Sequence, residues 1–228
     1  ATPQITLSDP IAAVAETGGP TLTFTATLDV ASSFVVTADC ATQDGTALAG
    51  EDYVGGSAAP CISFPAGTTG PQTINVLVLD DTMWEPTNPQ TFNLNLSNPV
   101  NATIFDGLAT GTINDDEAQP TMSINSVTQS EGTTPMTFTV TLTGGVDQSV
   151  SVDYYTADNQ AVAPEDYIAI PAVSTLTIPR LSTTGTIDVT LVDDTIDEDN
   201  QTFRVWLTNP EFGIVLTGTG PGRGTGTI

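Results

Sequence analysis

Apolar and polar residues alternate in many short runs along the 228 residues of this chain. A period of two is typical of β-strands that bury one face, and no segment shows helical periodicity over about ten residues or more. Clusters of Gly, Pro, Asn and Thr separate the runs, as turns between strands require. In the first half the runs span residues 5–7, 22–28, 36–40, 62–64, 74–78, 92–96 and 109–113.

The second half of the chain repeats the first. Glu51-Asp52-Tyr53 returns as Glu165-Asp166-Tyr167, and Leu96-Ser97-Asn98-Pro99 returns as Leu207-Thr208-Asn209-Pro210. These matches lie about 111 to 114 residues apart, which is the size of one immunoglobulin-like domain. We therefore predict an all-β protein of two tandem immunoglobulin-like antiparallel β-sandwiches, each of about seven strands, over residues 1–117 and 118–228.

Individual residues refine this expectation. The Gly and Pro residues of segments 16–20 and 131–135 are expected to break the first strand of each copy into two pieces. Trp84 stands among acidic residues and is expected on an exposed loop. Trp206 alternates with the apolar residues Val205 and Leu207, so its ring should point away from the core.

The charge of the chain is strongly one-sided. It has 27 acidic residues against three arginines, with no lysine and no histidine, and its net charge is −24. Such a surface repels nucleic acids and anionic membranes, so neither is an expected partner. No run of about 18 apolar residues is present, so membrane insertion is not expected either. A general need for solubility explains the total charge but not its gathering at repeated positions.

Acidic residues gather where the fifth run of each copy ends. Asp80-Asp81 followed by Glu85 in the first copy corresponds to Asp193-Asp194 followed by Glu198 in the second. Carboxylates gathered at one end of a sheet without Lys or Arg repel one another, and a bound hard divalent cation offsets this repulsion. Ca²⁺ suits such a site best because it accepts about 6–8 oxygen ligands in flexible geometry.

Further acids of the first copy lie in loops that share this end if successive strands alternate in direction. Turn propensity alone explains single residues such as Asp9, and also Asp44 and Asp158, but it does not explain the repeated glutamates. We expect the backbone carbonyl of Met83 as an additional ligand, and that of Ile196 in the second copy. The expected ligands of the first copy are Glu16, Asp52, Asp80, Asp81, Met83, Glu85, Asp115, Asp116 and Glu117.

Four features together resemble the Calx-beta module: an early Glu, Asp-Gly-Thr-Ala followed by Asp-Tyr, a strand ending in Asp-Asp-x-x-x-Glu, and a closing Gly-Thr-Ile-Asn-Asp-Asp-Glu. The resemblance covers both copies. It implies the immunoglobulin-like fold of that family and Ca²⁺ binding, as in sodium–calcium exchangers and modules of bacterial surface proteins. It places ligands at the first-copy positions above and, in the second copy, at Glu131, Asp166, Asp193, Asp194 and Glu198.

Two departures from the family pattern affect the expected sites. Pro86-Thr87-Asn88 stands where strong calcium sensors of the family carry further acids, so we expect a modest affinity in the first copy. The second copy stops at Ile228, where its own acidic run would begin, so we expect its C-terminal acids to be missing and its site to be incomplete in this chain.

The two cysteines, Cys40 and Cys61, both lie in the first copy. In an oxidising compartment they would form a disulfide that closes a short loop. Alternation argues against this pairing, because Cys61 points outward if Ile62 and Phe64 point inward. The argument is weakened by Pro60, since alternation need not hold at the start of a strand. A Cys40–Cys61 disulfide is therefore expected, with two free thiols as the alternative.

The residue types also limit the possible chemistry. Without histidine, Ser–His and Cys–His catalysis and histidine metal sites are excluded, and no pair of acids is grouped with aromatic residues as in a glycosidase cleft. We therefore expect no enzyme. We expect a Ca²⁺-binding structural and interaction module of a larger extracellular or cell-surface protein, bacterial in origin, in which Ca²⁺ rigidifies the domains and their joint and another protein or a glycan is the partner. Two alternatives are an intracellular Ca²⁺ sensor and a metal-free sandwich that binds protein or glycan.

Overall fold

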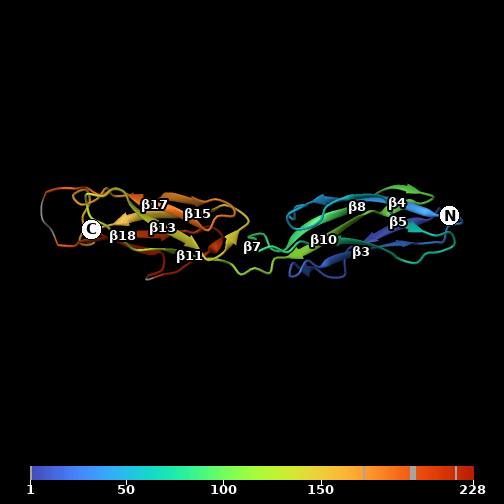
Figure 1. Cartoon of the computed structure of the whole chain (residues 1–228). Helices are drawn as coiled ribbons and strands as arrows, with labels where there is room; N and C mark the ends of the chain where they lie inside the picture. The colour runs from blue at the N-terminus through green and yellow to red at the C-terminus, as the bar shows by residue number, and fades with distance from the viewer. Residues whose placement is uncertain (1, 172, 196–198, 219) are drawn as a thin grey trace. The chain divides into compact units, whose positions relative to one another are not determined.

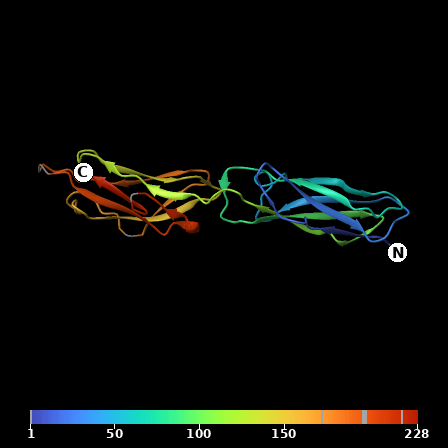
Figure 2. The same ribbon diagram turned by 90° about the horizontal axis from the view of Figure 1, so that it is seen from below.

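The computed structural model describes residues 2–171, 173–195, 199–218 and 220–228. The chain divides into two compact units, one of residues 1–81 and 87–116 and the other of residues 82–86 and 117–228. Each unit contains two packed sheets (Figures 1 and 2). The predicted all-β fold of two sandwiches is confirmed. Among the described residues, no helix is long and apolar enough to span a membrane.

In the first unit, one sheet has the strand order β6-β3-β1-β9 and the other has the order β2-β10-β8-β4-β5. Buried residues alternate with exposed or half-buried ones along β3 (Thr21–Leu28) and the first part of β8 (Gln90–Val100), because one face of each sheet meets the core. The other strands are β1 (Gln4–Ser8), β2 (Val14–Ala15), β4 (Val36–Asp44), β5 (Ser57–Phe64), β6 (Gln72–Leu77), β9 (Thr103–Asp106) and β10 (Leu108–Asn114).

The second unit repeats this arrangement with the orders β17-β13-β11-β19 and β12-β20-β18-β15-β16. A short 3-10 turn, η1 (Glu211–Gly213), follows β18. The strands are β11 (Thr121–Ile124), β12 (Val127–Thr128), β13 (Met136–Leu142), β15 (Val150–Ala157), β16 (Ser174–Ile178), β17 (Thr184–Val189), β18 (Thr202–Thr208), β19 (Val215–Leu216) and β20 (Arg223–Thr227).

The first strand of each unit is divided between the two sheets. β1 pairs with β9 and β2 with β10, both in parallel, and β11–β19 and β12–β20 repeat these pairings. The division falls at residues 9–13 and 125–126, whereas we expected it at 16–20 and 131–135. Those two segments instead connect β2 to β3 and β12 to β13. The error arose because a two-residue strand has no periodicity that a sequence pattern could show.

The two cores have the same aromatic centre. In the first unit, Tyr53 stacks on Phe92 with ring centroids 4.0 Å apart, and Phe24 meets Phe92 edge-on at 5.9 Å. A Cβ atom at Gly111 would lie 2.6 Å from Cε1 of Phe92, so this close packing requires glycine. The equivalent rings of the second unit are Tyr167, Phe203 and Phe138.

A disulfide joins Cys40 in β4 to Cys61 in β5, with Cα atoms 5.7 Å apart. The pairing of these strands is irregular: Ala38 faces Ile62, but Cys40 faces Ala58. This β-bulge places extra residues of β5 opposite β4 and changes the direction of their side chains. The alternation argument against the disulfide does not hold at this position for that reason.

Residues 82–86 pack as part of the second unit. β7 (Met83–Trp84) pairs in parallel with β14 (Gly145–Val146), and Trp84 meets Phe212 edge-on with ring centroids 6.3 Å apart. Trp84 is half-buried and contacts the hydrophobic core of that unit. Our expectation of an exposed loop residue is therefore wrong, because the large apolar ring lies against other apolar side chains.

Candidate metal centre

The parallel pairing of β2 with β10 brings the first acids together. Val14 faces Ile113 and Ala15 faces Asn114, so both strands end at the same edge of the sheet. The backbone N–H of Glu16 continues this ladder by donating to the carbonyl of Asn114 at 3.1 Å. Glu16 therefore lies beside Asp115, although 99 residues separate them in the sequence.

The turn that follows Glu16 holds two more carboxylates. The backbone N–H of Gly18 donates to Oδ2 of Asp80 at 2.9 Å, and the hydroxyl of Thr17 donates to Oδ2 of Asp116 at 2.5 Å. Gly18 has a φ of 75°, a conformation that glycine adopts without strain. The turn thus fixes the acids that follow β6 and β10 beside the end of β2.

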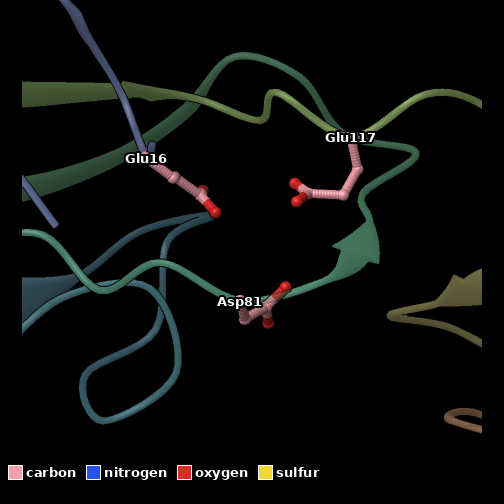
Figure 3. Close-up of side chains that lie close together, drawn as sticks. All are labelled: Glu16, Asp81 and Glu117. Atoms are coloured by element: carbon pink, nitrogen blue, oxygen red, sulfur yellow. The ribbon is translucent and has the colours of Figure 1, made fainter. Parts of the chain in front are cut away.

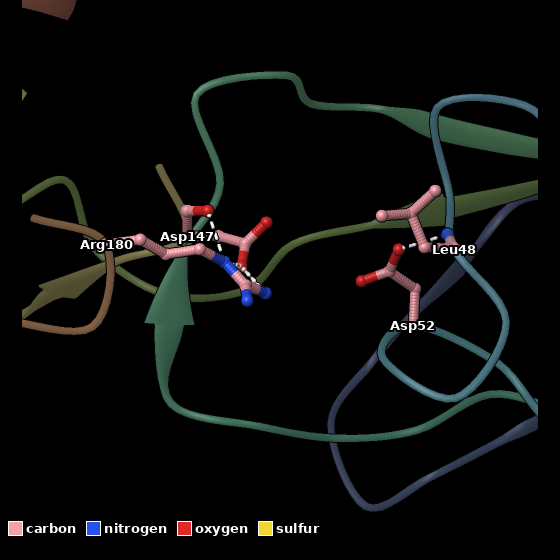
Figure 4. A network of polar contacts seen from close by, with 4 residues as sticks. All are labelled: Leu48, Asp52, Asp147 and Arg180. Carbon is pink, nitrogen blue, oxygen red and sulfur yellow. Dashed lines mark hydrogen bonds and ion pairs between the residues drawn. The ribbon is translucent and has the colours of Figure 1, made fainter. Parts of the chain in front are cut away.

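Hydrogen bonds hold Asp52 in its loop. They join it to Leu48 within the loop and to Leu79, which follows β6. Oδ2 of Asp52 accepts a hydrogen bond of 2.5 Å from the backbone N–H of Leu48 (Figure 4). The carbonyl of Asp52 accepts from the N–H of Leu79 at 2.9 Å, and Tyr53 forms a bridge with Val78. Asp52 consequently reaches the same end of the unit as Asp80, which follows Leu79 directly.

The side chain of Tyr53 stabilises this loop. Its hydroxyl donates to Oδ1 of Asp44 at 2.6 Å, and the same oxygen accepts from the N–H of Ala49 at 2.9 Å. The hydrogen bond from Tyr53, helped by that from Ala49, lowers the pKa of Asp44 below its usual value. Burial, followed by the hydrogen bond to Asp44, raises the pKa of Tyr53 to about 12. Asp44 therefore has the structural role expected from the sequence, and Tyr53 holds the loop that carries Asp52.

Three pairs of acids within the first unit each bring one carboxylate oxygen per member within 4.8 Å of the other. Figure 3 shows one of these pairs, Glu16 and Asp81. The pairs are Glu16 with Asp81, Glu16 with Asp52, and Asp80 with Asp116. Glu85 and Glu117, which we also expected as ligands, belong to chain segments of the second unit, and their role in metal binding stays a prediction.

Several of these carboxylates are removed from water. Glu16 is 1% exposed, Asp52 is 6% exposed and Asp115 is 9% exposed. Both carboxylate oxygens of Asp115 are buried and have no hydrogen-bond partner among the described residues. Burying an ionised carboxylate without a partner costs several kcal/mol. Residues 1–117 contain no Lys, Arg or His, so a basic side chain of this stretch cannot supply the missing positive charge.

The donor set fits a hard cation. The available donors are carboxylate oxygens from the ends of β2 and β10, from the 48–52 loop and from the segment after β6. Oxygen-only ligands from flexible loops match Ca²⁺, whereas Zn²⁺ sites are typically built from His and Cys. Met83, whose carbonyl we expected as a ligand, has its backbone in β7, and its role in metal binding stays a prediction.

Two residues that support the site were missed by the sequence reasoning. The side-chain amide of Asn88 donates to the carbonyl of Asp115 at 3.0 Å. From the sequence, segment 86–88 indicates only a lack of further acidic ligands. The hydroxyl of Thr17 holds Asp116, as described above. Neither residue stands in a pattern that would have indicated its partner, because the two contacts join positions 27 and 99 residues apart.

The second unit repeats this framework. Asp166 Oδ2 accepts from the N–H of Val162 at 2.6 Å, and the hydroxyl of Tyr167 donates to Asp158 at 2.6 Å. That hydrogen bond lowers the pKa of Asp158, and burial raises the pKa of Tyr167 well above its ordinary value.

The acids of this end of the second unit are less enclosed. Glu131 and Asp166 are half-buried, while Asp193 and Asp194 are exposed. Among the described residues, no three acids of either unit alone bring their oxygens within 4.8 Å of one another. Ile196 and Glu198, which we also expected as ligands, lie outside the described residues.

Comparison with known proteins agrees with the division into two repeated units. Residues 2–117 match the Calx-beta domain, and residues 114–221 match it again. The chain belongs to the Calx-beta family. Calx-beta domains are calcium-binding modules, in agreement with the predicted cation, Ca²⁺. The prediction that the chain consists of tandem Calx-beta domains is confirmed.

Among curated proteins, the chain is 31% identical over 178 residues to Extracellular matrix protein 3 of Lytechinus variegatus. The match covers 72% of this chain and 5% of that relative, so the chain spans a small part of its length. Among solved structures, CBD12 from CALX1.2 is 22% identical, with a TM-score of 0.43 and coverage of 91% of this chain and 80% of the other. The apo-form Calx CBD1 domain is 26% identical, with a TM-score of 0.44 and coverage of 51% and 100%.

Proposed function

We propose that the first Calx-beta unit binds Ca²⁺ through Glu16, Asp52, Asp80, Asp81, Asp115 and Asp116. The observation that carries this proposal is the carboxylate of Asp115, whose two buried oxygens have no hydrogen-bond partner among the described residues. A dication offsets both this desolvation cost and the repulsion between the neighbouring acids. Glu85, Glu117 and the carbonyl of Met83 are the proposed additional ligands.

The second unit is proposed to bind Ca²⁺ more weakly, if its described acids act alone. Glu131, Asp166, Asp193 and Asp194 are its candidate ligands, and Glu198 and Ile196 would add to them. None of these four described candidates is buried, whereas Glu16, Asp52 and Asp115 of the first unit are, and a more exposed carboxylate gains less from a bound cation because water already screens its charge.

The proposed role is that of a structural module in a larger extracellular protein, without catalytic activity of its own. Two observations support this setting. The Cys40–Cys61 disulfide is of a kind that persists in oxidising compartments, and one relative is an extracellular matrix protein. Extracellular Ca²⁺ modules function with dissociation constants of about 10⁻⁴–10⁻³ M. A bacterial origin and a rigidified joint between the units stay predictions.

Thermal unfolding of the chain tests the proposal. With a dissociation constant near 10⁻⁴ M, Ca²⁺ at 100 times this concentration would stabilise the bound unit by about 2.7 kcal/mol. For a domain of this size that is a rise in Tm of roughly 10 °C relative to chelator. Mg²⁺ at equal concentration should give a smaller rise, because it demands stricter octahedral geometry. Equal midpoints in Ca²⁺ and in chelator would contradict the proposal.

The affinity itself separates the extracellular role from the alternative of an intracellular sensor. Sensors of cytosolic Ca²⁺ have dissociation constants of about 10⁻⁷–10⁻⁵ M. A calorimetric value in that range, with the disulfide reduced, would favour the sensor. A value of about 10⁻⁴ M or weaker would favour the extracellular module.

A further inference from the structure

One outer sheet face of the second unit carries an unusual row of side chains. Tyr155 in β15 faces Trp206 in β18, and Trp206 faces Arg223 in β20. Arg204 lies on the same side of β18, two residues before Trp206. These four residues, here called the aromatic–arginine face, point away from the core. The neighbours Val205 and Leu207 are buried, while Arg204 and Trp206 are partly exposed.

The fold does not require these residues. The first unit has the same three-strand row, and there Ala41 faces Asn95 and Asn95 faces Leu108. Asn93 occupies the position equivalent to Arg204, paired with Gln43 and Thr110. The same sheet therefore forms with Ala41, Asn93, Asn95 and Leu108 at these positions. A Trp, a Tyr and two Arg in the second unit need a reason other than sheet stability.

The two arginines make this face the exception in a highly acidic protein. The chain has three arginines and no lysine, so the face holds two of its three basic side chains. The guanidinium of Arg223 lies over the Trp206 ring, 5.9 Å from the centroid, which holds it in a cation–π contact.

Arg204 remains available for an acidic ligand. Its Nη2 makes a long hydrogen bond of 3.5 Å to the neutral amide oxygen of Asn159. Within the described part of the chain, it has no carboxylate partner in an ion pair. Arg180, by contrast, is paired with Asp147 at 2.5 Å (Figure 4).

We propose that the aromatic–arginine face is a docking surface for an acidic segment of a partner protein. Trp, Tyr and Arg are the residue types that most often dominate binding energy in protein interfaces. The face is the outside of a sheet, and small-molecule sites are instead concave. Its arginines complement acidic side chains, and a guanidinium binds a carboxylate in a planar, two-pronged geometry.

The matched variants come from the first unit. Arg204→Asn, Trp206→Asn and Tyr155→Ala each install the residue that stands at the equivalent position there, so each is compatible with this fold. Arg180→Asn is the control, because it removes the same charge from the second unit but outside the face. Circular dichroism and the Tm of each variant establish that the second unit is folded.

The experiment measures fluorescence anisotropy of a labelled Glu-rich peptide with the full chain in millimolar Ca²⁺. We expect binding that Arg204→Asn and Trp206→Asn each weaken by about fivefold or more, with little effect of Arg180→Asn. Three results would overturn the proposal: no binding to the unmodified chain, equal loss with Arg180→Asn, or binding of polygalacturonate without binding of the peptide. The last result would assign the face to an acidic glycan. All three are independent of whether the first unit binds Ca²⁺ as proposed.

Discussion

The hydroxyl of Tyr53 donates to Oδ1 of Asp44 at 2.6 Å, and the Tyr53 ring stacks on Phe92 in the core. The pair ties the loop that carries Asp52 to the interior of the first unit. Tyr167 and Asp158 form the same contact, also at 2.6 Å, in the second unit. This repetition indicates that the hydrogen bond from Tyr53 to Asp44, and its copy from Tyr167 to Asp158, has a structural role in both repeats. It positions the acid that precedes the tyrosine and does not itself bind the cation.

The titration of Tyr53 predicts an alkaline limit to the stability of the first unit. Its pKa is raised to about 12, above the ordinary value of about 10 for tyrosine. A raised pKa contributes stability that is complete below pH 10 and is lost as the pH rises towards about 12. Tyr53→Phe should remove this part of the pH dependence, measured by urea unfolding between pH 8 and pH 12. Tyr155→Phe, on the outer sheet face of the second unit, is the control. An unchanged pH dependence in Tyr53→Phe would contradict the assignment.

Gly111 should be intolerant of a side chain. Its Cβ position is 2.6 Å from Cε1 of Phe92 and 3.1 Å from Cζ of Phe24. Gly111→Ala would therefore overpack the aromatic centre, and we expect the free energy of unfolding to fall by about 1–3 kcal/mol. Gly56→Ala is the control, because no atom lies within 4 Å of its Cβ position. The measurement is chemical denaturation of the two variants, and equal loss in both would show that close packing is not the cause.

Asp115→Asn should separate metal binding from folding. The substitution keeps the size of the side chain but removes the charge whose burial is uncompensated. We expect a Tm in chelator that is equal to or higher than that of the unmodified chain, and loss of more than half of the Ca²⁺-induced rise. Asp29→Asn is the control, because Asp29 uses Oδ1 to accept from the N–H groups of Gln4 and Val30, as an amide oxygen also can. A full Ca²⁺ response in Asp115→Asn would remove Asp115 from the site.

Removal of the disulfide should weaken the first unit. The two cysteines are 21 residues apart, and closing a loop of this length stabilises a fold by about 3 kcal/mol in the chain-entropy estimate. The double variant Cys40→Ala with Cys61→Ala should lower the Tm of the first unit, and a reducing agent should have the same effect on the unmodified chain. The double variant is also the control, because a reducing agent should not change its Tm. If reductant leaves the Tm of the unmodified chain unchanged, the disulfide is absent in solution or has no stabilising role.

The sequence was informative wherever a signal was regular or repeated. Alternation along segments such as 22–28 and 36–40 indicated strands, and the two copies of Asp-Tyr and Asp-Asp-x-x-x-Glu indicated the repeat and the acidic end. Each of these patterns is local in the sequence, so it can be recognised without knowing which strand pairs with which. The chain direction then sufficed to predict that loops after alternate strands share one end.

The remaining features depend on contacts between distant segments. The two-residue strands β2 and β12 carry no period, and the parallel pairings of β1, β2, β11 and β12 were not predicted. The bulge that brings Cys61 to Cys40 appears only when β5 is laid against β4. Trp84 was misplaced because its apolar neighbours are distant in the sequence; Phe212, for example, lies more than 100 residues away. The same holds for the support of Asp115 by Asn88 and of Asp116 by Thr17.

The most direct test of the calcium site is a crystal structure of the chain grown in about 10 mM Ca²⁺, with anomalous scattering used to locate the ions. We predict a peak at the acidic end of the first unit, with oxygens of Asp115 and of at least two other first-unit acids at about 2.3–2.6 Å from the ion. An acidic end without an anomalous peak, in which the oxygens of Asp115 are instead satisfied by protein or water hydrogen bonds, would contradict it.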